Sequence, residues 1–288
     1  MTESPSGRVV ASVVMPAFNA AATIEDQLAA LARQDGVGPL EIIVVDNGST
    51  DGTAETVARW RESMPNLRLL RAVERPGPSY ARNQGIDAAD SDLILLCDAD
   101  DIVDRHWAKT LLGRADDAAI VGGRAIWVDH EDHFVQDDEL FIPRLGFLPG
   151  FGAGNALLHR DVWRRVGRFD EDLLTAEDLE LAWRVQLAGH DVIRDDDAVV
   201  RYRQRASNRG VFIQGYRHGR GSVQIFTKYK NRGMPRSSTS VALKAWLLLI
   251  LRSVGVWMPA DQRTFWCRRF GTRWGRLTES VRRRVVYL

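Results

Sequence analysis

The stretch Leu93-Ile94-Leu95-Leu96-Cys97-Asp98-Ala99-Asp100-Asp101 joins an apolar run to a cluster of acidic residues. A short, uninterrupted apolar run of this kind predicts a strand that is buried on both faces of a sheet. The carboxylates that follow it repel one another, so they require a cation or a positively charged partner. Their hard oxygen atoms suit Mg²⁺ or Mn²⁺. The alternative interpretation is a solvated acidic turn before the helix near His106.

Strands and helices alternate on the N-terminal side of this stretch. The predicted strands are Arg8–Met15, Glu41–Val45 and Leu67–Arg71, and the helices between them begin at Thr23, Thr53 and Tyr80. This alternation predicts an α/β fold, with a mostly parallel sheet and helices on both of its faces. Ligands of such sheets bind beyond the carboxyl ends of the strands, which is where the polar motifs of this chain begin.

Beyond the acidic cluster the pattern is less regular. Residues 118–128 are expected to form a strand pair or one long strand, and a loop over 129–149 follows. The further expected elements are a glycine-rich turn at Gly150–Asn155, a helix from Thr175 to about Leu187, and edge strands at Asp191–Ile193 and Ala198–Tyr202. From about Ser207 onward the sequence shows only helical patterns.

A second acidic motif, Thr175-Ala176-Glu177-Asp178-Leu179-Glu180-Leu181-Ala182-Trp183-Arg184, begins a predicted helix. Its structural interpretation is a capping-box-like start between Thr175 and Asp178, followed by an i,i+4 ion pair between Glu180 and Arg184. Its functional interpretation is a carboxylate at a helix start that acts as the general base for a sugar hydroxyl. The spacing alone leaves both interpretations open.

Two further polar motifs, Asp46–Asp51 and Tyr80–Asn83, also allow two interpretations. The first is either a turn with a helix cap or a nucleobase site, because a carboxylate can accept a hydrogen bond from a base N–H. In the second, Arg82 is either a surface charge or a planar donor for a base or a phosphate.

The net charge of +1 hides a strong asymmetry along the chain. Residues 201–288 contain 20 Lys and Arg against 2 Asp and Glu, a local charge of +18, whereas the preceding residues carry −17. The basic part includes an apolar run, Val241–Met258, that Lys244 and Arg252 interrupt and that is shorter than a clean spanning helix. Its mixture of Trp and Arg is typical of a helix at a membrane interface.

The cysteines and the N-terminus suggest a compartment. Cys97 and Cys267 are too few for a disulfide framework. The polar segment Met1–Arg8 lacks the features of a signal peptide. We therefore expect a cytoplasmic protein that associates peripherally with the inner face of the cell membrane through its basic C-terminal part.

In their order and spacing, these motifs resemble those of the family-2 glycosyltransferases, which have the GT-A (Rossmann-like) fold. The resemblance runs from about Val9 to Arg205. It rests on Val13–Asn19, Val45–Thr53, Gly77-Pro78, Ala81-Arg82-Asn83, Asp98–Asp101, Gly154-Asn155-Ala156, Val166–Asp170 and Glu177-Asp178. It implies a catalytic GT-A domain over residues 1–205 and a basic, Trp-rich helical extension over residues 206–288.

The resemblance also implies roles for individual residues. The nucleotide-sugar-binding residues would be Pro16, Ala17, Asn19, Asp46, Asn47, Arg82, Asp98, Ala99 and Asp100. Asp98 and Asp100 would hold Mn²⁺ or Mg²⁺, Asp178 with Glu177 would be catalytic, and Gly154 with Asn155 would lie on the acceptor side. The chain departs from the family at Asn47, where Asp is frequent, and at Val200–Arg203, where a His is frequent.

The implied activity is an inverting, metal-dependent transfer from a nucleotide sugar to an acceptor hydroxyl. A UDP-sugar is favoured, a dTDP- or GDP-sugar is the other option, and the acceptor is a glycan or a lipid-linked glycan of a cell-surface polysaccharide. The alternatives are a nucleotidyltransferase and a non-catalytic binding module. No recognised nucleic-acid motif is present, so no nucleic-acid partner is expected.

Overall fold

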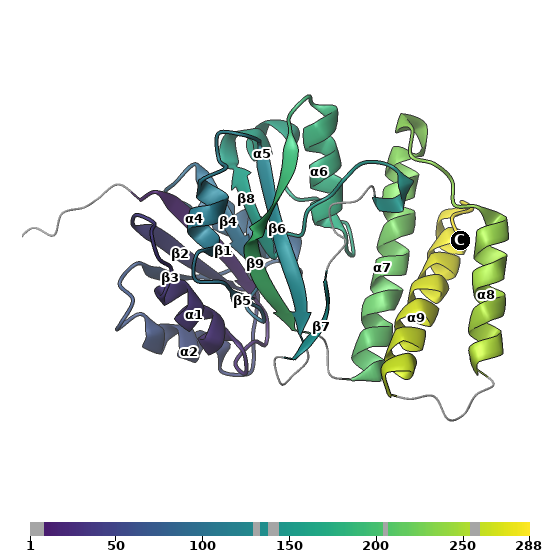
Figure 1. The fold of residues 1–288 in the computed structure, drawn as a ribbon, viewed down its shortest axis with the longest axis horizontal. Coiled ribbons are helices and arrows are strands. Elements are labelled where there is room, and N and C mark those ends of the chain that lie inside the picture. The colour runs from purple at the N-terminus through teal and green to yellow at the C-terminus, as the bar shows by residue number, and fades with distance from the viewer. Residues whose placement is uncertain (1–8, 129–132, 138–143, 204–206, 254–259) are drawn as a thin grey trace, which may run out of the picture.

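A computed structural model describes residues 9–128, 133–137, 144–203, 207–253 and 260–288. Figure 1 shows a curled sheet flanked by helices, beside which three long helices stand in a row. These three are α7 (Asn208–Tyr229), α8 (Thr239–Ser253) and α9 (Ala260–Arg283). The expected α/β fold and helical C-terminal extension are both confirmed. The boundary expected at 205/206 falls at residues 204–206, outside the described residues.

Within the described residues, nine strands form one sheet in the order β3-β2-β1-β4-β8-β6-β9-β5, with β7 paired to β6. The strands are β1 Ala11–Ala17, β2 Leu40–Asp46, β3 Leu67–Arg71, β4 Leu93–Cys97, β5 Ile102–Val103, β6 Ile120–Val128, β7 Phe134–Asp137, β8 Asn155–His159 and β9 Val192–Arg203. Strands β1 to β4 run parallel, and β8 joins β4 in the antiparallel direction. The carboxyl ends of β1, β2 and β4 therefore lie at one edge.

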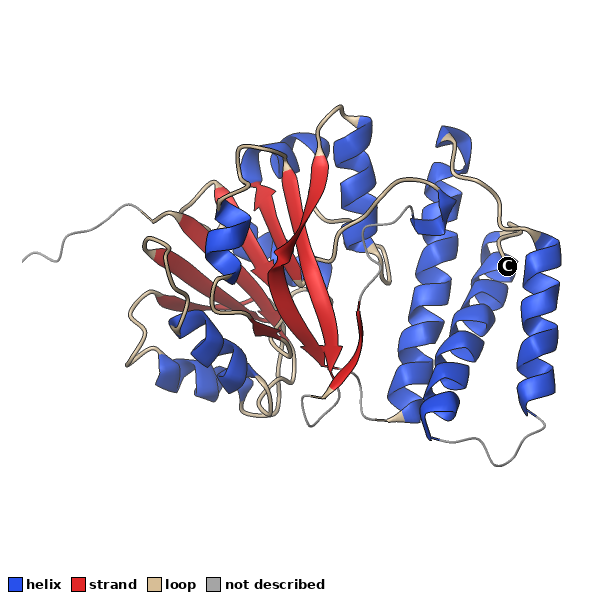
Figure 2. Ribbon diagram, viewed as in Figure 1, coloured by secondary structure: helices blue, strands red, loops and turns tan. Residues whose placement is uncertain are grey.

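Helices cover both faces of the sheet, as Figure 2 shows. Successive residues of β1 alternate between two hydrophobic clusters: Val13 and Met15 belong to one and Val14 to the other. The first cluster is completed by α1 Ile24–Ala32, α2 Thr53–Trp60 and α4 Trp107–Leu112, and the second by α3 Pro78–Asp87, α5 Arg160–Val166 and α6 Glu177–Leu187. Burial on both faces explains why these strands are uninterrupted apolar runs.

The sequence predictions for the middle of the chain had different outcomes. Residues 120–128 form one long strand, β6, which is one of the two expected alternatives. The prediction of two edge strands was wrong, because both are parts of one 12-residue strand, β9, which lies between β6 and β5. The register of β6 against β9 shifts between Gly122 and Arg124, and this irregularity separates the two apolar segments of β9. The loop expected over 129–149 contains β7, and its residues 129–132 and 138–143 lie outside the described ones.

The start of α6 also differs from the predicted capping box. The N-cap is Ala176, whose backbone is left-handed with a φ of 64°, and no side chain caps the helix. Thr175 points elsewhere: its hydroxyl donates to the carbonyl oxygen of Arg217 on α7 at 3.4 Å. Packing against the extension therefore overrides the local capping pattern. The predicted Glu180–Arg184 ion pair is present, with N–O distances of 2.8 and 3.0 Å.

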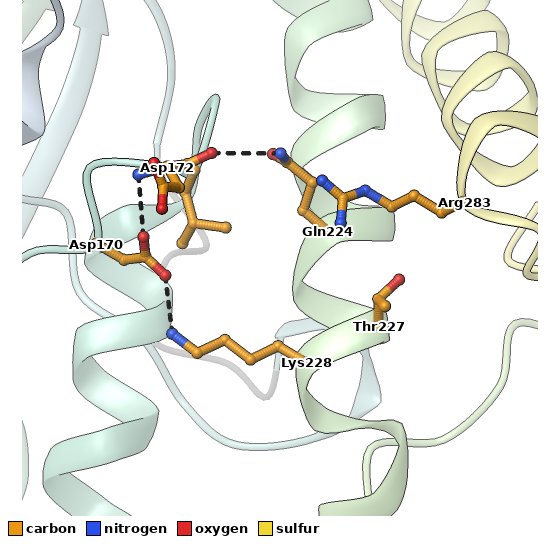
Figure 3. Close-up of a pocket in the computed structure, with 7 residues that line it drawn as sticks. Asp170, Asp172, Gln224, Thr227, Lys228 and Arg283 are labelled. Atoms are coloured by element: carbon orange, nitrogen blue, oxygen red, sulfur yellow. Dashed lines mark hydrogen bonds and ion pairs between the residues drawn. The ribbon is translucent and has the colours of Figure 1, made fainter.

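The extension is anchored on the α/β part of the chain through α6 and the loop before it. Glu180 is fully buried, accepts a hydrogen bond from Tyr229 at 2.8 Å and forms an ion pair with Lys228 at 2.5 Å. Figure 3 shows Lys228 and Gln224 of α7 reaching Asp170 and Asp172 across a hollow of about 200 Å³. Phe226 and Tyr229 share a core cluster with the sheet's helices. The extension is therefore packed on the α/β part of the chain and not merely tethered to it.

Helices α7 and α9 meet through glycines. A Cβ at Gly219 would overlap the carbonyl oxygen of Thr272, and one at Gly275 would overlap that of Tyr216. Only glycine lets two helix backbones approach this closely. Along the described part of the chain, no helix is both long enough and apolar enough to cross a membrane.

We predict that Gly219→Ala destabilises the protein by about 1 to 3 kcal/mol, because the new methyl group forces α7 and α9 apart. Helix propensity alone would predict that the variant is more stable than the wild type, since alanine is favoured over glycine in a helix interior by up to about 1 kcal/mol. Urea unfolding measures the difference. Gly189→Ala is the control: its site has open space but a φ of +86°, so only backbone strain of about 1 kcal/mol is expected. A Gly219→Ala protein as stable as the wild type would contradict the close contact.

Candidate active site

The loops after β1 and β2 are joined by Asn19. Its side-chain oxygen accepts from the backbone N–H of Thr50 at 2.9 Å, and its own N–H donates to the Ser49 hydroxyl at 3.0 Å. Asn19 has a φ of 51°, a left-handed conformation that asparagine tolerates better than most residues. Two motifs separated by about thirty residues are thus held together at the carboxyl edge of the sheet.

Asp46 and Asn47 end β2 but have different environments. Asp46 is 1% exposed, and one carboxylate oxygen accepts from the N–H of Ser49 at 3.0 Å. The Asn47 side chain donates to the carbonyl oxygens of Ala72 and Arg75 and accepts from the N–H of Gly77 at 2.6 Å. The amide of Asn47 therefore holds the loop after β3 in place, and its contact with a nucleotide stays a prediction.

The acidic cluster after β4 is held in place by α1. The side chain of Gln27 donates to the carbonyl of Asp98 at 3.1 Å and accepts from the N–H of Val103 at 3.0 Å, and Thr23 donates to the carbonyl of Ala99 at 3.1 Å. Gln27 was not among the residues that the sequence predicted for the site. Its position on the apolar face of α1, three residues after Ile24, is the sequence feature that indicates a buried polar side chain with a specific partner.

The carboxylates of Asp98 and Asp101 converge on Gly154. A Cβ added to Gly154 would lie 2.7 Å from Asp98 Oδ2 and 3.4 Å from Asp101 Oδ2, so the carboxylates occupy the space that a side chain would need. Asp101 is 1% exposed. Burial, together with the charges of Asp100 and Asp98, raises the pKa of Asp101 well above its usual range. Asp101 was not among the predicted metal ligands.

This arrangement fits a divalent cation that the substrate helps to coordinate. In the described residues, no three His, Cys, Asp or Glu side chains form a complete metal site. Mg²⁺ and Mn²⁺ sites in phosphate-handling enzymes commonly take one or two carboxylates from the protein and the other ligands from phosphate and water. A buried carboxylate beside two others is the environment that such an ion neutralises. Asp98 and Asp101 can supply inner ligands, and the exposed Asp100 lies at the opening.

Arg82 connects this cluster to α6. Its guanidinium is buried and forms ion pairs with Asp98 Oδ1 at 2.7 Å and with Glu177 Oε1 at 2.8 Å. Its Nε has no hydrogen-bond partner. Burial lowers the pKa of Arg82, but the charges of Asp98 and Glu177 outweigh this effect, and the group stays protonated. Arg82 therefore bridges two carboxylates, and its contact with a nucleotide stays a prediction.

Glu177 and Asp178 occupy the first turn of α6 in unequal environments. Burial and the charge of Asp178 raise the pKa of Glu177, whereas Arg82 acts in the opposite direction. Asp178 is partly exposed, and one oxygen accepts from the N–H of Ala153 at 3.3 Å. The turn that contains Gly154 thus lies between Asp178 and the acidic cluster. Of the two carboxylates, Asp178 is the one accessible to a substrate.

Asn155 has a structural role. Its side chain is 5% exposed, accepts from the indole N–H of Trp107 at 2.8 Å, and donates to the carbonyls of Arg124 and Ala198 at 2.9 and 2.8 Å. These bonds tie α4, β6 and β9 together. The place of Asn155 on the acceptor side stays a prediction, and of this pair Gly154 is the residue that lies against the carboxylates of Asp98 and Asp101.

Aromatic side chains of β6 and β9 form a further wall beside the acidic cluster, and the extension contacts this wall through Arg268. The rings of Trp127 and Tyr202 lie 4.7 Å apart, and the guanidinium of Arg268 on α9 lies 5.0 Å from the Trp127 ring. Burial and the charge of Asp101 raise the pKa of Tyr202. Tyr202 and Arg203 stand where the family often has His. Arg203 forms an ion pair with Asp26 at 2.7 Å.

This chain is similar in sequence to known proteins. The sequence model described as "Glycosyl transferase family 2" matches residues 12–170. The chain is 26% identical over 230 residues to Glycosyltransferase AglE of Haloferax volcanii, covering 75% of this chain and 73% of that protein. It is 26% identical over 275 residues to Succinoglycan biosynthesis protein ExoA of Rhizobium meliloti, covering 86% of this chain and 82% of that protein.

Solved structures share the fold. Mannosyltransferase PcManGT from Pyrobaculum calidifontis, in complex with GDP-Man and Mn²⁺, aligns with a TM-score of 0.67 at 21% identity, over 96% of this chain and 88% of that one. S. aureus TarS 1–349, in complex with UDP-GlcNAc, aligns with a TM-score of 0.58 at 19% identity, over 96% of this chain and 93% of that one.

We predict that Arg82→Ala destabilises the protein by about 3 to 5 kcal/mol, because it leaves the Glu177 carboxylate buried without its cation. Chemical denaturation measures the loss. Arg105→Ala is the matched control, since Arg105 pairs with Asp35 on the surface and such pairs contribute at most about 1 kcal/mol. Equal stability of the two variants would refute a buried, bridging role for Arg82.

Proposed function

The chain belongs to glycosyl transferase family 2, and from that premise we propose that it transfers a sugar from a nucleotide donor to an acceptor hydroxyl with inversion at the anomeric carbon. The observation that carries the proposal is the ion-pair network of Arg82. It places the carboxylate suited to the donor's metal, Asp98, and the acidic start of α6 on two arms of one side chain. We expect the donor diphosphate to bind near Asp98 and the general base to act from the start of α6, so that both reach one sugar.

The donor is proposed to bind at the carboxyl ends of β1 and β2, where Pro16 and Ala17 precede Asn19. Asp46 would accept the N–H of uracil, thymine or guanine, which is compatible with UDP-, dTDP- and GDP-sugars; UDP is favoured by the resemblance to the family. Phe18, 63% exposed at the same edge, offers an aromatic face to the base. Two structurally similar proteins hold GDP-Man and UDP-GlcNAc, respectively.

The proposed reaction is a single displacement. Asp178 accepts the proton of the acceptor hydroxyl while the oxygen attacks the anomeric carbon and the nucleoside diphosphate leaves. A divalent cation held by Asp98 and Asp101, with the exposed Asp100 as a further ligand at the opening, would stabilise the negative charge of the leaving diphosphate. Arg82 keeps Asp98 and Glu177 in position, and Glu177 places a second carboxyl beside the base. No covalent intermediate with the protein is needed.

The acceptor is proposed to be a glycan or a lipid-linked glycan. It would approach between the turn at Gly154 and the wall formed by Trp127 and Tyr202, because aromatic faces suit sugar rings and this wall lies beside the acidic cluster. The similarity to Succinoglycan biosynthesis protein ExoA supports a role in polysaccharide synthesis. Family membership disfavours the nucleotidyltransferase and binding-module alternatives.

The first test is a thermal-shift panel of UDP-, GDP- and dTDP-sugars with and without Mn²⁺. One donor is expected to raise the melting temperature of the wild type only when the metal is present. A ligand that binds the folded state raises the free energy of unfolding in proportion to the logarithm of its concentration, once this concentration exceeds the Kd. Asp101→Asn should abolish this shift yet leave the metal-free protein at least as stable, because it removes a poorly compensated buried charge. Asp100→Ala should weaken the shift, and the exposed Asp104→Asn should behave as wild type.

A second test concerns the base. Asp178→Asn is expected to lower kcat by about 100- to 10,000-fold while the donor's Kd stays unchanged, because the amide cannot accept the acceptor proton. Transfer measured by nucleoside diphosphate release, together with calorimetry of the donor, separates the two effects. Asp172→Asn, whose side chain is 87% exposed, is the matched control. Retention of wild-type kcat by Asp178→Asn would assign the base to another residue.

A further inference from the structure

Helix α8 exposes an aliphatic face. Its exposed residues are Val241, Leu243, Leu247, Leu248, Ile250 and Leu251, each between 54% and 70% exposed. At 100° per residue they span one side of the helix, and Lys244 is the charged residue among them. A contiguous aliphatic surface on a folded protein marks a site of interaction with a protein or a membrane.

The opposite side of α8 attaches it to the protein. Ala242 and Leu249 are buried, and the carbonyl of Leu249 accepts from the indole N–H of Trp266 at 3.0 Å. The Trp246 ring meets Phe270 edge-on at 6.0 Å. Figure 1 shows α8 at the outer end of the row of helices, on the side away from the sheet. The aliphatic face therefore points outward from the molecule.

The charge around this face is positive. Residues 207–288 contain two acidic residues, Asp261 and Glu279, and Glu279 is 1% exposed and paired with Arg220 and Arg283. A second copy of the chain would bring the same positive charge against this face, and like charges would oppose its docking. An anionic lipid surface instead complements both the aliphatic residues and the surrounding Lys and Arg.

The geometry of α8 allows it to lie in a membrane surface but not to cross the membrane. Its 15 residues extend about 22 Å at 1.5 Å per residue, which is less than the roughly 30 Å hydrocarbon core. Trp246 and Trp266 beside basic residues match the composition of helices that lie at the interface. We propose that α8 inserts its aliphatic face into the surface of an anionic membrane and holds the catalytic part there.

The test uses the full chain and vesicles. Wild type is expected to float with phosphatidylcholine vesicles that contain phosphatidylglycerol and much less with phosphatidylcholine alone. Leu247→Glu with Leu251→Glu should lower the bound fraction at least tenfold. Val73→Glu, on an exposed valine of the catalytic part, is the matched control and should float as wild type. Unchanged melting temperatures and donor-induced shifts would show that the variants are folded, independently of lipid binding.

Two outcomes would overturn the proposal. If wild type does not float with either kind of vesicle, or if the double variant floats as well as wild type, α8 is not the lipid-binding element. A wild type that is dimeric in gel filtration and does not float, with a monomeric double variant, would assign the face to a second copy of the chain. The rate of transfer to a water-soluble acceptor should be equal in wild type and the double variant. This rate tests the proposed reaction separately, so a failure of lipid binding can be told apart from a failure of the proposed reaction.

Discussion

The ion pairs of Arg82 are the interaction on which the site depends. The guanidinium comes from α3, Asp98 from the end of β4 and Glu177 from the start of α6, so one buried cation joins three elements that are distant in sequence. Without it, two carboxylates would face each other in a poorly hydrated space. A neutral residue could not replace it, since breaking a buried pair leaves an uncompensated charge.

The same region concentrates more negative charge than Arg82 can neutralise. Asp101 remains buried with its pKa raised, and the left-handed Ala176 brings the acidic start of α6 to the same place. A buried carboxylate and a strained backbone lower the stability of the folded protein, unless a bound cation or polar substrate compensates for the charge. The fold tolerates them because two large hydrophobic clusters, one on each face of the sheet, enclose the strands from which the site projects.

The three helices of the extension have different structural roles. Helix α7 is fixed to α6 through Glu180 and Tyr229, and α9 is fixed to α7 through glycine contacts that leave little freedom. Through α7 and α9 the extension touches Trp127 and Tyr202, so it forms part of the site's surroundings. Helix α8 contributes little to this core. Its aliphatic side faces outward, where it can contact a membrane.

The sequence by itself determined the strands β1 to β4, because burial on both faces demands uninterrupted apolar runs. It also determined that Asn19, Asp46 and Asp98 lie at one edge of the sheet, because parallel strands bring their carboxyl ends to the same edge. Only the tertiary structure decided which groups those residues bind. The partners of Arg82, Asn47 and Asn155 come from segments tens of residues away. The periodicity of a sequence indicates local structure only, so it cannot predict contacts between distant segments. The burial of Asp101 and the outward face of α8 were likewise settled by packing between elements, which no single segment specifies.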